Sequence, residues 1–282
     1  MGRFFFLSDR GNAANEDFAR ATERYGVVID GASGLAGEPL FQDRFSTNAQ
    51  WLAHAVGERV CEALDAGADG RASLEGAVAA ARAELERALG GPVAGMDPLA
   101  VPSATLALAV AGPGTVELYG LGDSPLLALT RDGRLLVSTD EELEALDARA
   151  VALMSERDPW GRLSGPERRR LVDDVIRANR LLRNVEGGYW CLDPTGDGLA
   201  HLRRLSLPRD ELSAVAGLTD GLWRAFDLFG VADAAAELGS LTPRRARAVL
   251  ARLRELEADD PDYRRFPRLK RSDDASMFWL GL

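Results

Sequence analysis

The sequence predicts an α+β fold in which helices pack on antiparallel sheets, within a single domain over residues 1–282. Two observations carry this prediction. Short apolar segments typical of strands alternate with longer segments in which apolar residues recur every three or four positions, as on one face of a helix. Strands precede and follow each helical pair, and no repeat or linker-like tract divides the sequence, an order typical of helices layered on sheets.

The N-terminal segment predicts the first strands. Residues 3–7 are predicted to form the first strand, and the Val-Val-Ile run at residues 27–29 indicates a buried strand. This second strand leads into Asp30 and a glycine-rich turn at residues 31–34, so Asp30 is expected where the strand ends. A carboxylate at that place is costly to bury unless a positive charge meets it.

Helices are predicted from the spacing of apolar residues. The first two cover about residues 47–66 and 73–89, with Ser46 or Thr47 as the N-cap of the first. Another long helix is predicted to begin at Pro243, because proline is favoured at the first helical position. The remaining strands are predicted over residues 103–110, 116–123, 126–130, 135–138, 187–193, 202–207, 213–219 and 276–280.

The composition argues against several classes of binding partner and indicates a cellular location. The formal net charge of -10 argues against nucleic acid or an anionic membrane as partner. The apolar start is too short for a signal peptide, and no apolar run approaches the roughly 20 residues of a membrane span. Cys61 and Cys191 are too few for a disulfide framework, so we expect a protein of the reducing cytoplasm.

Acidic residues recur at strand ends and turns, and their chemistry indicates a metal site. Hard divalent ions such as Mg²⁺ and Mn²⁺ prefer oxygen ligands, and the two histidines, His54 and His201, are remote in sequence from these residues. Two such ions can share a water, lower its pKa and hold a phosphoryl group for attack, which requires one carboxylate to bridge them. Asp30 is the candidate for that bridge. The acidic residues are Glu16, Asp17, Asp30, Asp123, Asp220 and Asp273.

The motifs that contain these residues resemble those of the protein phosphatase 2C family, the metal-dependent serine/threonine phosphatases. In order they are Asn-Glu-Asp (15–17), an apolar strand into Asp-Gly (30–31), Ser-Ala-Thr-Leu (103–106), Gly-Asp-Ser (122–124), Thr-Asp-Gly-Leu-Trp (219–223) and Asp-Asp-Ala-Ser (273–276). They span residues 8–280, essentially the whole sequence. The resemblance, closest to bacterial members, implies a four-layer αββα sandwich: a central antiparallel β-sandwich flanked by helix pairs, with a binuclear Mg²⁺ or Mn²⁺ site at one end.

The resemblance also implies a role for each acidic residue. Asp30 resembles the bridging ligand, and Gly31 the residue whose backbone carbonyl binds one ion. Glu16 resembles a second ligand of that ion, and Asp17 a residue that supports a bound water. The other implied ligands are Asp220 and Asp273 for the second ion, and Asp123 for a third, weaker ion found in bacterial members.

The sequence departs from the family pattern in several places. The family's phosphate-binding arginine is missing from the shortened turn before Asn15, and Arg10 is our hypothesis for its replacement. Ala32 stands where eukaryotic members have a histidine that could act as general acid, and Asp274 stands where many members have asparagine. An arginine-rich segment at about 147–193 falls at the family's variable flap and is predicted to be mostly helical.

The function implied is hydrolysis of phosphoserine and phosphothreonine in proteins by a water that bridges the two ions, without a phosphoenzyme. The expected partners are a phosphorylated protein and a cognate serine/threonine kinase. Two alternatives remain: a catalytically degraded module that binds phosphoproteins, which the missing arginine supports, and a phosphatase of small phosphorylated molecules. Metal-dependent hydrolysis would distinguish a phosphatase from the degraded module. A comparison of phosphopeptides with small phosphomonoesters addresses the second alternative.

Overall fold

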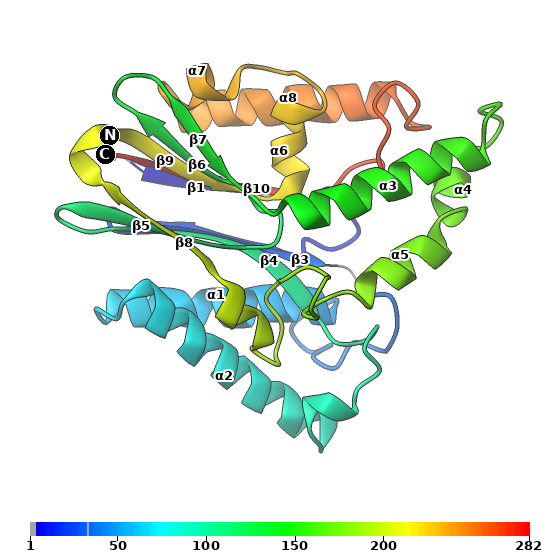
Figure 1. Cartoon of the computed structure of the whole chain (residues 1–282), viewed down its shortest axis with the longest axis horizontal. Helices are drawn as coiled ribbons and strands as arrows, with labels where there is room; N and C mark the ends of the chain where they lie inside the picture. Colours follow the sequence, from blue (N-terminus) through cyan, green and yellow to red (C-terminus); the bar gives the residue numbers. More distant parts are fainter. Residues whose placement is uncertain (1–3, 33) are drawn as a thin grey trace.

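Two antiparallel sheets pack face to face between layers of helices, so the four-layer αββα sandwich is confirmed (Figure 1). The computed structural model describes residues 4–32 and 34–282. One sheet, here the β9 sheet, has the order β1 (Phe4–Asp9), β10 (Ala275–Gly281), β9 (Leu212–Leu218), β6 (Leu126–Thr130), β7 (Leu135–Ser138). The other, the β4 sheet, has the order β2 (Asp17–Ala21), β3 (Tyr25–Ala32), β4 (Ser103–Ala111), β5 (Thr115–Leu121), β8 (Arg203–Pro208).

The helices fall into three groups (Figure 1). The β4 sheet is covered by α1 (Asn48–Asp65) and α2 (Gly70–Leu89), and the β9 sheet by α6 (Asp220–Asp227), α7 (Ala234–Leu238) and α8 (Pro243–Asp259). A helical insert lies beyond one end of the sandwich and consists of α3 (Glu141–Arg157), α4 (Gly165–Arg170) and α5 (Asp173–Arg180). Short 3₁₀ turns occur at η1 (Val93–Gly95), η2 (Asp197–His201) and η3 (Arg209–Glu211).

Within the described ranges, no helix is both long enough and apolar enough to cross a membrane.

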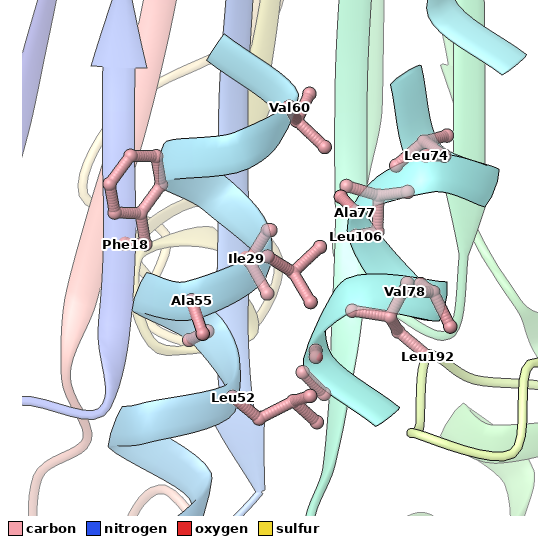
Figure 2. Close-up of a cluster of buried hydrophobic side chains, with 14 of the residues drawn as sticks. Phe18, Ile29, Leu52, Ala55, Val60, Leu74, Ala77, Val78, Leu106 and Leu192 are labelled. Carbon is pink, nitrogen blue, oxygen red and sulfur yellow. The ribbon is translucent and has the colours of Figure 1, made fainter. Parts of the chain in front are cut away.

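Strand β3 is buried on both faces, which explains its continuous apolar run. Val27 and Ile29 belong to the core beneath α1 and α2, where Ile29 lies among the side chains of both helices (Figure 2). Val28 points the other way, into the core between the sheets, together with Phe278 of β10. Because successive residues of a strand face opposite sides, a strand with helices on one side and a sheet on the other is apolar at every position.

Phe278 fills the space left by two glycines between the sheets. A Cβ built at Gly26 of β3 would lie 2.2 Å from the Phe278 ring, and one at Gly217 of β9 would lie 2.4 Å from it. Phe278 is opposite Gly217 in the register of β9 and β10, whereas Gly26 belongs to the facing sheet. The ring therefore contacts backbone in both sheets at once.

Capping residues set the helix boundaries. Thr47 caps α1 by accepting a hydrogen bond from the backbone N–H of Gln50 (3.0 Å), one of the two caps predicted. Helix α2 begins at Gly70, three residues before the predicted start, because the Asp69 side chain accepts from the N–H of Ala72 (2.9 Å). Helix α8 begins at Pro243 as predicted.

Two sequence predictions about strands are wrong. Strand β3 does not end at Asp30, because Gly31 and Ala32 continue the register against the start of β4. Residues 187–193 do not form a strand: they make only the isolated bridges of Tyr189 with Arg183 and Leu192 with Ala104. The segment begins with Gly187 in the left-handed conformation (φ 75°), a turn that interrupts extended pairing. The predicted positions Arg3 and Ser33 lie outside the described residues.

Candidate metal centre

A cavity of about 190 Å³ lies where strand ends of both sheets meet the helical insert. Asp30 comes from the end of β3, Asp123 follows β5, Asp220 begins α6 directly after β9, and Asp273 precedes β10. The sequence places these residues far apart, and the antiparallel sheets bring them to one end of the sandwich. Asp147 of α3 adds a fifth carboxylate to the wall.

Other carboxylates crowd around Asp30 and Asp123. Burial raises the pKa of the Asp30 carboxyl, and the charges of Asp17, Asp220 and Asp273 raise it further. Burial and then Asp220 and Asp147 raise the pKa of Asp123 in the same way. Carboxylates crowded together out of water favour either a proton or a bound cation, so this part of the cavity suits a divalent ion with oxygen ligands.

Asp17 is a neighbour of Asp30 but does not line the cavity. The two residues are opposite each other in the register of β2 and β3. Asp17 is 3% exposed, and its Oδ2 accepts a hydrogen bond from Thr219 Oγ1 (3.2 Å). Its buried Oδ1 has no hydrogen-bond partner among the described residues. A buried oxygen of this kind is suited to a water held beside the cavity, the role that the family resemblance implies.

Glu16 and Gly31 are packed against each other, but the Glu16 carboxylate is not on the cavity wall. The N–H of Gly31 donates to the Glu16 backbone carbonyl (3.2 Å), and a Cβ at residue 31 would lie 2.7 Å from that oxygen. Only glycine allows this approach. The Glu16 Oε1 accepts from Thr47 Oγ1 (2.6 Å), which ties it to the start of α1.

Asp220 and Asp273 are paired with basic side chains. Arg224 Nη2 donates to Asp220 Oδ2 (2.9 Å) and Asp273 Oδ2 (3.2 Å). Lys270 Nζ lies 3.0 Å from Asp273 Oδ1 and 2.9 Å from its Oδ2. Burial alone would raise the pKa of Asp273, but Lys270 and Arg224 outweigh it and hold the pKa at about 2. Among the described residues, no three acidic, histidine or cysteine side chains are already arranged to hold a metal ion.

Sequence reasoning missed these two cations. Lys270 is the one lysine of the sequence and lies three residues before Asp273, and Arg224 lies four residues after Asp220. Residues four apart in a helix are neighbours on its surface, so the Asp220–Arg224 spacing was a usable signal. The contact of Arg224 with Asp273 joins residues 49 positions apart and carries no local signal.

Asp274 anchors the shortened turn before β2. Its Oδ1 accepts from the backbone N–H groups of Gly11 (2.8 Å) and Asn12 (3.2 Å), and its Oδ2 accepts from the N–H of Glu16 (2.8 Å). An asparagine side chain has one acceptor oxygen, whereas a carboxylate has two. The aspartate that departs from the family pattern therefore satisfies three N–H groups that asparagine could not.

The arginines differ in whether they reach the cavity. The Arg10 guanidinium is exposed, lies 3.5 Å from the carbonyl oxygen of Ala13, and is not among the cavity residues. Arg169 of α4 and Arg180 of α5 do line the cavity. Arg183 has a structural role instead, since it donates to the carbonyl oxygen of Val101 (2.9 Å).

Comparison with known proteins identifies one family. A sequence model described as protein phosphatase 2C matches residues 10–255. The PPM Ser-Thr phosphatase MsPP from Mycobacterium smegmatis, solved with cacodylate, is 19% identical, with 99% of this chain and 97% of that chain covered and a TM-score of 0.53.

Two further solved structures share the fold. The catalytic domain of the serine threonine protein phosphatase PstP, solved with two manganese ions, is 17% identical over 99% of this chain and 97% of that chain, with a TM-score of 0.55. PppA, a regulatory component of T6SS in Pseudomonas aeruginosa, is 17% identical over 99% and 97%, with a TM-score of 0.56. Among curated proteins, none matches.

Proposed function

Because the chain belongs to the protein phosphatase 2C family, we propose that it hydrolyses phosphoserine and phosphothreonine in proteins with the help of Mg²⁺ or Mn²⁺. The observation that supports this most is the convergence of Asp30, Asp123, Asp220 and Asp273 on one cavity. The oxygen-only donor set favours these ions over zinc or copper. A serine/threonine kinase that modifies the same substrates is the proposed partner, and the cytoplasm, where the free buried Cys61 and Cys191 stay reduced, is the proposed place.

The proposed site has two halves. Asp30 would be a ligand of both ions. The carbonyl of Gly31 and Glu16, once its carboxylate turns from Thr47, would complete one site, Asp220 and Asp273 would complete the other, and Asp123 would help with a weaker third. Bound ions would supply Lewis acidity toward the phosphoryl oxygens and a water of lowered pKa as nucleophile. The chain itself positions the backbone of residues 16 and 31 and the carboxylate of Asp17: the N–H of Gly31 donates to the Glu16 carbonyl, and Thr219 donates to Asp17.

The phosphate group would meet the basic residues of the insert. Arg169, which is ion-paired with Asp173, and Arg180 line the same cavity as the carboxylates that come from the sheets. Guanidinium groups bind phosphate through charge-assisted hydrogen bonds. We therefore assign to them the phosphate contact that the missing upstream arginine provides in the family, in preference to Arg10.

A second candidate is a degraded module that binds phosphoproteins without hydrolysing them. The pairing of Asp220 and Asp273 with Arg224 and Lys270 favours it, because cations that already satisfy these carboxylates oppose a bound metal. Asp30 argues against this candidate. No ion pair of the described chain involves Asp30, and in a protein that had lost its metal site random mutation would be expected to replace such a residue.

Hydrolysis assays separate the candidates. p-Nitrophenyl phosphate and a phosphothreonine peptide are assayed with Mn²⁺ or with excess EDTA, for wild type, Asp30→Asn and the exposed control Asp210→Asn. If the protein is a metal-dependent phosphatase, we expect Mn²⁺-dependent turnover in wild type and in the control, and loss of this turnover in Asp30→Asn. Absence of turnover in folded wild type would exclude the phosphatase activity. Binding of the phosphothreonine peptide would then be measured to test the degraded-module candidate. Faster turnover of small phosphomonoesters than of peptides would favour the small-molecule alternative.

A further inference from the structure

The two halves of the centre differ in how their charge is balanced. Ion pairs of the described chain reach Asp220 and Asp273, through Arg224 and Lys270, but do not reach Asp30 or Asp123. Both oxygens of Asp273 accept from cations, and its Oδ1 also accepts from Asn12 Nδ2 (2.7 Å). Both oxygens of Asp273 are therefore already in use, and Asp220 Oδ2 is occupied by Arg224.

An ion entering this half meets two obstacles. It must replace hydrogen bonds to Asp273 that already involve a full positive charge, and such bonds are stronger than neutral ones. It must also lie close to the ammonium of Lys270 and the guanidinium of Arg224, and like charges repel strongly where water is scarce. No ion pair of the described chain involves Asp30, so the first obstacle is absent there, and the charge of Lys270 acts less on Asp30 than on Asp273 and Asp220.

The two cations differ in mobility. Arg224 projects from α6, its side chain is 14% exposed, and it holds Asp220 and Asp273 together. Lys270 lies in the loop before β10, and its side chain is 42% exposed. A flexible, half-exposed lysine can leave Asp273 for solvent, whereas the largely buried Arg224 would lose its contacts with two carboxylates on leaving.

We propose that Lys270 acts as a built-in counter-ion that takes the place of a second metal ion at Asp220 and Asp273. The chain then binds one divalent ion tightly, in the Asp30 half, and a second one weakly, only after Lys270 has left Asp273. This inference rests on the proposed metal dependence, and it specifies how many ions the resting protein holds.

Counting bound Mn²⁺ tests the proposal without any substrate. The free Mn²⁺ signal in electron paramagnetic resonance, during titration of the metal-free protein, gives the number and affinity of sites. Wild type should bind one Mn²⁺ tightly. Lys270→Met should bind a second at least about 10-fold more tightly than wild type does. Lys270→Arg keeps the charge and should behave as wild type, and so should Arg271→Met, which removes a neighbouring charge.

The outcomes separate this inference from the proposed function. Two equally tight ions in wild type, or an unchanged second site in Lys270→Met whose thermal unfolding matches wild type, would overturn the counter-ion role even if the protein hydrolyses phosphopeptides. One tight ion in wild type and two in Lys270→Met would support it even if hydrolysis is absent. Failure of every variant to bind Mn²⁺ would overturn both.

Discussion

Asp17 and Asp30 are opposite each other on adjacent strands, β2 and β3, so that two carboxylates project side by side from the same face of the sheet. Burial raises the pKa of Asp17, and the charges of Asp274, Asp273 and Asp220 add to it against the hydrogen bond with Ser276. Asp30 faces the cavity and Asp17 does not, so Asp17 acts on an ion only through Asp30 or through a water.

Asp17→Asn should therefore weaken Mn²⁺ binding without removing it. Loss of a residue behind the ligands typically costs about 10–100-fold in metal affinity, and we expect a loss in that range. Isothermal titration with Mn²⁺ measures it, and Asp210→Asn serves as the exposed control. An affinity equal to wild type would show that Asp17 does not support the ion.

The metal-free protein should lose stability as pH rises. The raised pKa of Asp17 means that the folded state holds this proton more tightly than the unfolded state, in which the pKa is about 3.9. The free energy of unfolding is therefore highest below that value and falls as pH rises through the folded-state pKa.

Thermal unfolding in EDTA across pH 4–8 measures this dependence, with the range set by the ordinary carboxyl pKa of about 4 and its upward shift. Asp17→Asn should flatten the curve. Asp273 acts in the opposite sense. Its pKa of about 2 lies below the ordinary carboxyl value, so the stability that it contributes is present above the ordinary value and is lost as pH falls through the folded-state pKa. A curve that is as steep in the variant as in wild type would assign the effect to other carboxyls.

Asp274→Asn should destabilise the fold although it preserves side-chain size. The asparagine loses one of the two acceptor oxygens that serve Gly11, Asn12 and Glu16, and hydrogen bonds to charged groups contribute about 1.5–3 kcal/mol each. We expect the free energy of unfolding in urea to fall by a value in that range. A variant as stable as wild type would mean that the turn keeps its place without the carboxylate.

Arg180→Ala should raise the KM for a phosphopeptide, and Arg10→Ala should not. Arg180 lines the cavity and Arg10 is exposed away from it. A charge-assisted hydrogen bond of about 1.5–3 kcal/mol corresponds to roughly 10–100-fold in KM. Steady-state kinetics at saturating Mn²⁺ compares the two variants directly, and the opposite ranking would restore Arg10 as the phosphate ligand.

Phe278→Ala should be among the most destabilising core substitutions. The ring is fully buried between the sheets, and removal of a buried phenylalanine typically costs about 3–5 kcal/mol. Urea unfolding measures the loss, with Trp160→Ala, a large but 78% exposed side chain, as the control. A loss below that of the control would contradict the packing.

The sequence predicted those parts of the fold that local chemistry determines. The apolar run at residues 27–29 and the cap at Thr47 depend on neighbouring residues, and both predictions are confirmed. Helix α6 was not predicted, because it is only eight residues long, too short for a clear period. The strand predicted at residues 187–193 is absent, because Gly187 turns the chain there.

The candidate site was predicted as a set of carboxylates but not in its charge balance. The order of Asp30, Asp123, Asp220 and Asp273 along the sequence was enough to expect their convergence, and they do line one cavity. In the sequence, the spacing of Lys270 and Asp273 is that of an ordinary surface ion pair. Only the fold shows that Arg224 pairs with the same carboxylate. The assigned roles of the carboxylates in binding metal stay predictions.

Phe278, Gly26 and Gly217 should be inherited as a unit. Each glycine leaves room for the ring, so a larger residue at either position is harmful while Phe278 is present. Loss of the ring relieves the contact at Gly26, whereas a Cβ at Gly217 would still lie 2.9 Å from the Cβ of Ala107. Mutations at the three positions are therefore non-additive, and a lineage can change this part of the core only through paired replacements. Relatives that lack the phenylalanine should be able to carry a side chain in place of Gly26.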